Sequence, residues 1–584
     1  MRKNNLIHLT VSAAIVLAAS FSLSSCEDIL GEWDRSTPDL FPNIGKNEVT
    51  ITKTATGASV TVNTPSDITN LLASVTSDIA AKGSSEYVFD ITNNGVKSTG
   101  SDNTITVPKV SGSNINLVFD KGINTESTLV IKASETASST PTTAVNKLTI
   151  TMPDGTTSLN LVIDMPETSV TVKTASGSAV YEGIVANTAT NTLIIESGVT
   201  IKNLQVKGGI VVVKEGGKVE TNVYAPESND YVMYQYGEQE GVEPVWVDLK
   251  GDGNYVPNVQ NEDGSAYLFK NLKVIKGAAD YARIALYNGG KPLEKLTIAA
   301  DAAVLFNQQS TCVKVIEGEG EGTAKVTLSG WAQNYSWMEN EKEVYPLYCN
   351  LNVEKISGII FTAPINTNSN VVESDNVIIR NQLNGVPTNI ENCTFNFDQV
   401  SFATAKETTG SAKNCKFLSP KNNQQVYIQV PAQTAEISSY KFAFSSCNFG
   451  EGTMIYPDLE QRVYEYDSNG NPVFYNNPCY EYRMDGRWYV VESLDDVPKG
   501  ATEVYTREYD IQKYTYAEFN NYDITVAFDG CKLADASINK ESGCFGFPYV
   551  PSGVVFKYEI DGTSYSDYEW KWDEATQKSY CILK

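Results

Sequence analysis

Acid–base chemistry in most of this chain cannot use histidine, which leaves carboxylate pairs and lysine or arginine bases open. The single histidine among 584 residues is His8, close to the N-terminus. The rest of the chain therefore cannot use Ser-His-Asp or Cys-His catalysis, histidine-ligated zinc or a histidine acid or base. No catalytic residue is predicted, and Asp398, Asp467, Asp495 and Asp496 are only the least unlikely candidates among the acids. No carboxylate cluster recurs at a fixed spacing, so solvated surface acids are the simpler interpretation.

Aromatic residues concentrate in one long segment. Residues 456–522 contain twelve of the 32 tyrosines together with Trp488. Rings flanked by carboxylates and amides suit neutral sugars, because sugar C–H bonds pack on a ring while the hydroxyls form hydrogen bonds. Trp488, Tyr480 and Tyr482 are therefore candidate ligand-binding residues, and we expect Trp488 to expose its indole. The alternative, which is the commoner outcome in β-proteins, is that these rings pack on each other across strands.

Three shorter segments also combine aromatic and acidic residues. They are residues 224–257, 331–348 and 558–572, the last of which includes Tyr565, Tyr568, Trp570 and Trp572. Within the first, "DLKGDGN" at 248–254 has the oxygen-rich composition of a calcium loop but lacks the Glu and the spacing of an EF-hand. A plain turn is the preferred interpretation, and no other metal or cofactor site is expected.

The cysteines do not form a metal or redox motif. Nine lie beyond Cys26, no CxxC pair occurs, and the odd number over a long chain argues against a dense disulfide framework. We interpret them chiefly as small buried hydrophobic residues, with one or two disulfides as the alternative. These nine are Cys312, Cys349, Cys393, Cys415, Cys447, Cys479, Cys531, Cys544 and Cys581.

Four of these cysteines occupy the same position in a recurring six-residue motif. The motif occurs as "IENCTF" (390–395), "AKNCKF" (412–417), "FSSCNF" (444–449) and "FDGCKL" (528–533), and "KISGIIF" (355–361) fits the same pattern. Each Cys shares a strand face with the residue two positions later, whereas the apolar residue three positions earlier has the wrong parity for that strand. A two-residue corner of turn-forming types must therefore separate two strands.

This repeated strand–corner–strand motif resembles the coils of right-handed parallel β-helix proteins, the pectin-lyase-like superfamily. The interval from Cys393 to Cys415 is 22 residues, within the coil length of that fold, and the longer intervals are then coils with inserted loops. The resemblance implies that Cys393, Cys415 and Cys447 stack inside a solenoid. The 84 residues between Cys447 and Cys531 leave on the order of 60 as a protruding element. Its centre, 463–491, has the turn signals "DSNGNP" and "MDGR" and predicts a β-hairpin or small sheet.

The N-terminal half predicts short strands and one helix. Strand-like runs recur at intervals of roughly ten to fifteen residues between Gly, Asn, Asp, Ser and Thr, a pattern that also fits a β-sandwich for residues 47–170. The helix is predicted from Thr64 at the N-cap, with Pro65 at N1 and Asp67 at N3 in a capping box, to a stop at Gly83. Its apolar stripe would cover the open end of a solenoid. The stripe consists of Ile68, Leu71, Leu72, Val75 and Ile79.

The N-terminus predicts the localisation of the protein. Arg2 and Lys3 precede an apolar run, residues 11–23, that is too short to span a bilayer and has the form of a signal peptide. The following "LSSC" resembles the lipobox of bacterial lipoproteins, which implies that Cys26 is lipidated and becomes the mature N-terminus. The acidic residues behind it are similar to those of surface lipoproteins of polysaccharide-foraging gut bacteria. We therefore expect a lipid-anchored outer-membrane protein exposed at the cell surface.

Composition sets limits on the partners. Without Arg2 and Lys3, 43 basic residues face 70 acidic ones, a net charge of −27 that repels nucleic acid and anionic lipid. The predicted function is binding of a neutral polysaccharide, host glycan or other surface partner, without catalysis. A polysaccharide lyase or glycoside hydrolase is the alternative, and an adhesin or structural stalk is a further one.

The expected domains are a signal peptide (1–25), an acidic tether (26–46), a capped solenoid (47–450), a Tyr-rich β insert (451–525), and last coils with a C-terminal cap (526–584).

Overall fold

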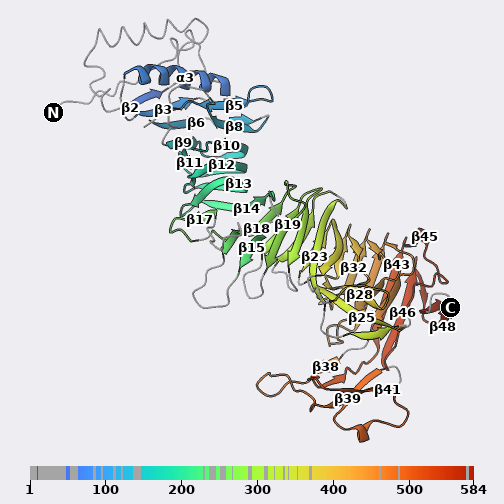
Figure 1. Cartoon of the computed structure of the whole chain (residues 1–584). Coiled ribbons are helices and arrows are strands. Elements are labelled where there is room, and N and C mark those ends of the chain that lie inside the picture. Colours follow the sequence, from blue (N-terminus) through green and yellow to red (C-terminus); the bar gives the residue numbers. More distant parts are fainter. Residues whose placement is uncertain are drawn as a thin grey trace. The chain divides into compact units, whose positions relative to one another are not determined.

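The described residues form an all-β structure with long parallel sheets (Figure 1). The chain divides into two compact units, residues 1–302 and 303–584. The structure, a computed structural model, describes residues 9–10, 48–52, 64–82, 87–93, 96–109, 113–119, 123–125, 127–135, 147–227, 231–235, 245–249, 258–265, 267–286, 293–307, 313–320, 322–332, 336–339, 341–351, 353–366, 371–459, 462–484, 487–546, 548–573 and 578–584.

The predicted helix is present as α3 (Pro65–Lys82). Its capping box forms as expected, because the Asp67 amide donates to Thr64 Oγ1 (3.2 Å) and the Thr64 amide donates to Asp67 Oδ2 (3.1 Å). Of the predicted stripe, Ile68, Leu71 and Leu72 are buried, and the other two side chains lie outside the described set. The Thr106 amide donates to Thr69 Oγ1 at 2.9 Å, so the helix satisfies an amide of the strand beneath it.

Two parallel ladders build the first unit. Ladder I contains β1 (Leu9–Thr10), β2 (Glu48–Thr52), β3 (Tyr87–Asn93), β6 (Ser113–Phe119), β9 (Lys147–Met152), β11 (Ser169–Thr174) and β17 (Val259–Asn261). Ladder II contains β5 (Thr104–Val107), β8 (Leu129–Ala133), β10 (Thr156–Asp164), β14 (Lys218–Tyr224), β18 (Asn271–Val274) and β20 (Leu293–Ile298). Two long strands, β12 (Ala179–Ile195) and β13 (Val199–Val213), contribute to both ladders.

Smaller pairs accompany these ladders. β4 (Val96–Ser98) pairs with β7 (Ile123–Thr125) in parallel. β15 (Tyr231–Gln235) pairs with β16 (Val245–Leu249) in antiparallel and with β19 (Ala282–Leu286) in parallel.

The parallel pairing excludes the β-sandwich alternative for residues 47–170. Every pairing described among the strands of that segment is parallel, whereas a sandwich is built from antiparallel sheets. Consecutive strands of ladder I bring buried side chains into register, which forms a continuous apolar row. That row is Ile115, Leu148, Val170, Leu193, Val211 and Val259.

Three parallel ladders build the second unit. Ladder III contains β22 (Val313–Gly318), β26 (Lys355–Ser357), β29 (Asn389–Glu391), β32 (Thr409–Lys413), β35 (Ser439–Ser445), β43 (Tyr522–Asp529) and β46 (Val554–Ile560). Ladder IV contains β21 (Ala303–Asn307), β23 (Ala324–Ala332), β27 (Ile359–Asn366), β30 (Thr394–Asn396), β33 (Lys416–Leu418), β36 (Asn448–Phe449) and β44 (Lys532–Leu533). Ladder V contains β25 (Lys342–Asn350), β28 (Val377–Val386), β31 (Gln399–Phe402), β34 (Gln425–Gln429) and β37 (Met454–Asp458), and β24 (Trp337–Glu339) forms a hairpin with β25.

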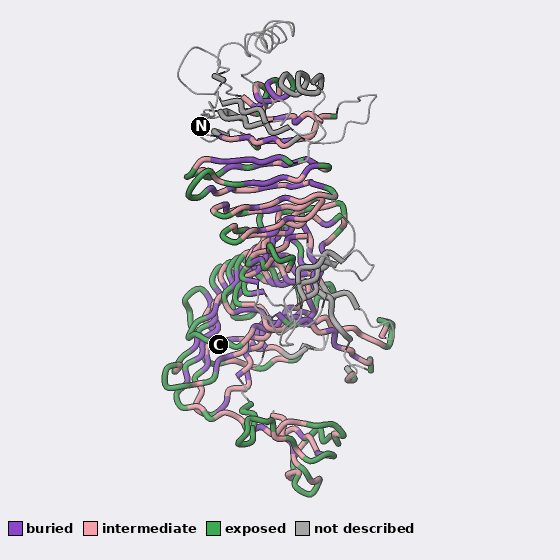
Figure 2. The backbone as a smooth tube through the Cα atoms, turned by 90° about the vertical axis from the view of Figure 1, so that its left-hand side faces the viewer, coloured by how far each residue is buried: buried purple, intermediate pink, exposed green. Residues whose placement is uncertain are grey.

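The chain visits these ladders in a fixed order. From β29 to β37 it passes through ladders III, IV and V three times in succession. Each passage adds buried residues to the same rows. In ladder IV the row is aromatic, with Phe361, Phe395, Phe417 and Phe449 stacked at centroid distances of 5.1–5.3 Å. Figure 2 shows such buried positions recurring along the strands.

The predicted corners lie between ladders III and IV. At each one the second corner residue has a positive φ, and the preceding and following strands belong to different ladders. Glycine and asparagine adopt this left-handed conformation most readily, which explains why they occupy most of the second corner positions of the motif. The five residues are Gly358 (φ 67°), Asn392 (56°), Asn414 (50°), Ser446 (53°) and Gly530 (58°). The cysteines that follow are buried, as expected, and their strands pair in parallel.

Each ladder of the second unit ends on an antiparallel strand. β47 (Thr563–Tyr565) pairs with β46, and β45 (Ala536–Ser537) pairs with β44. Beyond β37, single bridges at Phe545 lead to β49 (Lys578–Leu583), which pairs with β48 (Tyr568–Asp573). Antiparallel terminal strands interrupt the parallel series at the C-terminal end of the chain.

The insert forms small sheets of its own (Figure 1). β38 (Arg462–Tyr464) pairs with β42 (Tyr514–Tyr516), and β39 (Cys479–Met484) lies between β40 (Arg487–Val491) and β41 (Thr502–Arg507), with a 3₁₀-helix at Leu494–Asp496. The expected hairpin is therefore present. β35 pairs directly with β43 across the base of the insert. Within the expected bounds 451–525, β37 and the first residues of β43 pair with strands of the ladders.

Candidate functional site

The insert has its own hydrophobic core. Cys479, Val490 and Tyr514 are buried together, with Tyr475 and Tyr516 packed against them. The Tyr514 and Tyr516 hydroxyls both donate to the Trp488 carbonyl, at 2.9 and 2.5 Å. These contacts fix the strand that carries Trp488, so the insert can hold surface side chains in defined positions.

None of the three predicted ligand-binding residues is fully exposed, although Trp488 was expected to expose its indole. Tyr482 is only 7 % exposed and stacks on Tyr489 at a centroid distance of 5.5 Å, and burial raises the pKa of its hydroxyl. Its ring is therefore a packing element. Trp488 is half-buried, because Tyr505 packs beside its ring at 5.8 Å. Tyr480 is also half-buried and lies opposite Val491.

Sequence reasoning missed two exposed tyrosine rings, one on β41 and one just after it. Tyr505 and Tyr509 are 45 % and 57 % exposed. The guanidinium of Arg507 lies 5.0 Å from the Tyr505 ring centre and 5.9 Å from that of Tyr509, and the guanidinium of Arg483 lies 6.0 Å from the Trp488 ring. We call these five residues the insert face. The alternation in "VYTREY" (504–509) was the available signal, but it does not reveal which neighbours lie across the sheet.

Both arginines of the insert face are paired with carboxylates. Arg507 donates to Glu481 through Nε (2.8 Å) and Nη2 (2.5 Å), and Arg483 donates to Glu503 at 3.0 Å. The pairs neutralise the positive charge and hold the guanidinium groups over the rings. The face therefore offers aromatic surface and hydrogen-bonding groups with little net charge.

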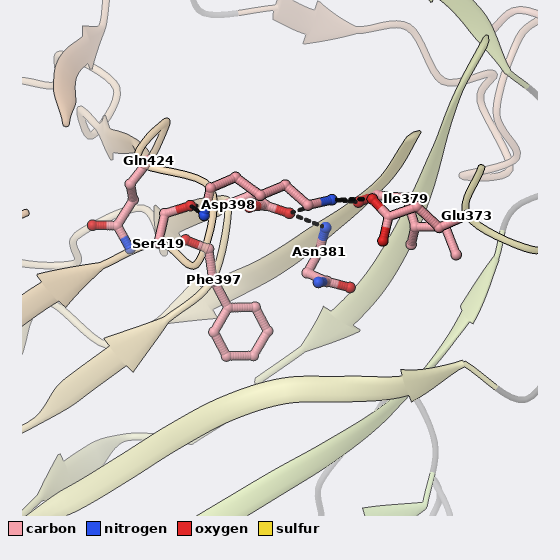
Figure 3. Close-up of polar contacts among 8 residues, drawn as sticks. Glu373, Ile379, Asn381, Phe397, Asp398, Ser419 and Gln424 are labelled. Carbon is pink, nitrogen blue, oxygen red and sulfur yellow. Dashed lines mark hydrogen bonds and ion pairs between the residues drawn. The ribbon is translucent and has the colours of Figure 1, made fainter. Parts of the chain in front are cut away.

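Asp398 is buried and fully engaged in structural bonds (Figure 3). Its carboxylate accepts hydrogen bonds from the Asn381 amide (3.0 Å) and the Ser419 hydroxyl (3.0 Å), and Lys421 Nζ lies 4.0 Å away. Lys421 also donates to Glu373 at 2.5 Å. The expectation of a solvated acid was wrong here, because residues from two other turns of the chain converge on it. The arrangement fixes a corner between β30 and β31.

The other candidate acids have local roles. Asp467 accepts the amides of Asn469 and Asn471 (both 2.8 Å) in the "DSNGNP" turn, and these bonds, led by those from Asn471, lower the pKa of its carboxyl. Asp495 and Asp496 are exposed in the first turn of the 3₁₀-helix.

Buried cysteines directly precede four strands of ladder IV. The Sγ atoms of Cys393 and Cys415 donate to the carbonyls of Glu391 and Lys413, each at 3.3 Å. Hydrogen bonding to neighbouring thiols, with burial, raises the pKa of Cys415. Eight cysteines are described, and all are free and buried, so the alternative of disulfides finds no support among them. A protonated, buried thiol is a poor nucleophile.

A shallow groove lies on the solvent side of ladder II. It has a volume of about 370 Å³, and Val162 and Val185 form part of its lining. The lining also includes three amide side chains, one acidic side chain and one basic side chain, and the location of the groove was not predicted. These polar residues are Asn160, Glu182, Asn203, Gln205 and Lys273.

Several predicted features lie outside the described residues. Cys26, residues 11–46, Cys312 and most of the 248–254 loop belong to this group, as do the side chains of Trp331 and Trp337. Among the residues that are described, no three His, Cys, Asp or Glu side chains are grouped so that they could hold a metal ion. No described helix has the length and apolar character required to cross a bilayer.

Comparison with known proteins gives no assignment. No protein family, curated protein or solved structure matches this chain. A functional conclusion therefore depends on the residues and geometry of the chain itself.

Proposed function

We propose that this chain is an exported, lipid-anchored β-solenoid that binds a neutral polysaccharide through the insert face. The observation that carries the ligand class is the group of exposed tyrosines, Tyr505 and Tyr509, beside charge-compensated arginines. Tyrosine presents a rigid, amphipathic surface at low conformational-entropy cost. Guanidinium and carboxylate groups at its edge supply donors and acceptors for sugar hydroxyls.

The charge distribution favours a neutral ligand over an anionic one. Each guanidinium of the insert face already binds a carboxylate, so a sulfate or uronate would have to displace Glu481 or Glu503. The whole chain also carries a formal charge of −25. A neutral glycan meets neither obstacle.

For the scaffold, we propose a right-handed parallel β-helix of the pectin-lyase-like kind. Support comes from the fixed order in which the chain visits ladders III, IV and V and from the repeated corner conformation. In a closed coil the buried rows of the three ladders would face one interior. An experimental structure would determine closure and handedness.

For the localisation, we propose a lipid anchor on Cys26. Cys26→Ala should abolish labelling by a fatty-acid probe and release the protein from the outer-membrane fraction. Cys312→Ala is the matched control and should remain labelled. Labelling of the Cys26→Ala protein would contradict this part of the proposal.

The ligand proposal is tested by affinity electrophoresis in gels that contain soluble neutral polysaccharides: β-glucan, xyloglucan, arabinoxylan, galactomannan, α-mannan and starch. Tyr505→Ala should weaken binding about tenfold, or roughly 1.4 kcal/mol. Tyr466→Ala, another exposed tyrosine of the insert, is the matched control and should bind normally. Equal binding by both variants would contradict the insert face as the site. Assay of the same mixtures for new reducing ends or unsaturated products tests the lyase or hydrolase alternative.

A further inference from the structure

Two tryptophans on one strand of the C-terminal hairpin are exposed. Trp570 and Trp572 lie two residues apart on β48 and are 52 % and 46 % exposed. Their ring planes differ by 18° and their centroids are 6.4 Å apart. We call them the Trp pair. Large aromatic side chains are usually well covered in soluble proteins, so two adjacent exposed indoles indicate a contact surface.

The position of β48 explains why the rings are not covered. Residues directly opposite each other in an antiparallel pair share a face, and Trp570 lies opposite Cys581 of β49. Cys581 is buried because β49 bridges to Phe545 on its other side. Among the described strands, β48 pairs with β49 alone. The side of β49 that is buried thus continues onto β48, which is an edge strand, and there the two indole rings are exposed to solvent.

The opposite face of β48 is charged and internally neutralised. Glu569 pairs with Lys571 and also with Lys584, whose Nζ lies 3.1 Å from Glu569 Oε2. Charged side chains on a short edge strand disfavour addition of another strand. The Trp pair therefore suits a ligand that uses ring faces more than one that uses backbone hydrogen bonds.

We propose that the Trp pair is a second polysaccharide-binding platform, on which neighbouring sugar units of a neutral chain stack against the two nearly parallel indoles. The proposal shares its ligand class with the proposed function but uses none of the insert-face residues. Indole gives the largest apolar ring surface of any side chain. A neutral chain is favoured because no unpaired basic group accompanies the rings among the residues described on β48.

The test uses the full-length protein and the same six polysaccharides. Trp570→Ala/Trp572→Ala should reduce retardation at least tenfold for a polysaccharide that retards the wild type. Trp570→Phe/Trp572→Phe, which keeps aromatic faces, should recover part of the binding. Lys571→Ala, on the same strand but the other face, is the matched control and should bind as the wild type does. Circular dichroism checks that each variant is folded.

The outcomes separate this site from the insert face. Loss of binding in the Trp570→Ala/Trp572→Ala protein supports the platform even when Tyr505→Ala has no effect, a result that would remove only the insert-face proposal. Unchanged binding in the folded double variant overturns the platform, as does a wild type that none of the six polysaccharides retards. A dimeric wild type that becomes monomeric in the double variant, measured by light scattering, would instead assign the rings to self-association. If the alanine variant fails to fold, quenching of tryptophan fluorescence by the polysaccharide is compared between the wild type and the Trp570→Phe/Trp572→Phe protein, which keeps Trp488. Smaller quenching in this variant supports the platform, and equal quenching overturns it.

Discussion

Removal of the insert should leave the ladders folded. We consider replacement of residues 462–517 by a short Gly-Ser linker, which keeps Leu459 and the segment 518–521. The retained Asn520 exchanges two hydrogen bonds with the Gln433 side chain, both 2.7 Å, and Phe519 stacks on Tyr522. These residues therefore belong structurally to the ladders and must stay.

The expected loss of stability is small. One contact between the insert and the ladder segment is the Arg487 guanidinium 4.9 Å from the Tyr549 ring centre. Both residues are half-buried, and such a pair contributes about 1 kcal/mol. Linker length matters little, because doubling a flexible loop costs only about 0.6 kcal/mol. A change of 1 kcal/mol shifts Tm by about 2–4 °C in domains of 150–250 residues, so we expect a shift below about 4 °C.

Thermal unfolding followed by circular dichroism measures this shift. Deletion of 456–522 is the matched comparison and should unfold the protein. It removes Tyr456, which stacks on Tyr427 at 5.2 Å, and the buried Tyr522, whose hydroxyl donates to the Pro431 carbonyl at 2.9 Å. If the 462–517 deletion also unfolds, the insert is part of the ladder core and the reasoning is refuted.

Three further changes test the packing. Phe417→Ala removes a fully buried ring with Phe395 and Phe449 stacked on either side, so urea unfolding should show a loss of about 3–5 kcal/mol; a loss below 1 kcal/mol would contradict a packed aromatic row. Thr64→Ala should cost about 1 kcal/mol and speed hydrogen exchange in α3, and unchanged exchange would contradict the capping box. Burial raises the pKa of Cys544 from its ordinary 9.0 to about 12. The thiol therefore loses its proton at lower pH in the unfolded chain than in the folded one, and the free energy of unfolding should fall between pH 9 and 12. Cys544→Ala should show a shallower fall, and a pH profile identical to that of the wild type would refute this account.

Local signals in the sequence were sufficient for the helix and the corners. The capping box needs only Thr64 and Asp67, three residues apart, and the helix begins beside them. A left-handed corner needs a suitable residue such as Asn414 followed by an inward strand, and both are contiguous in the sequence. Features of this kind depend on neighbours along the chain, so periodicity and turn chemistry predict them.

Exposure in the candidate site could not be predicted in the same way. Trp488 is half-buried because of Tyr505, and the two meet through β39, whose pairing with β41 contains a register shift between Glu481 and Arg483. A shift of one residue reverses which side chains share a face. Asp398 likewise depends on partners from other passages of the chain. Contacts that depend on register between distant strands leave no mark in the local pattern.

The direct pairing of β35 with β43 has a consequence for folding kinetics. Most neighbouring strands of ladder III are separated by a few tens of residues, whereas Ser439 and Asp523, which pair, are 84 positions apart. A solenoid can nucleate in one part and propagate to its neighbours, but the step to β43 must first close this long loop. An insert that folds early would shorten the effective loop, because its own sheets bring residues 462 and 516 together. We therefore expect the pairing of β43 with β35 to be the slowest step in ladder III, at a rate set by the insert.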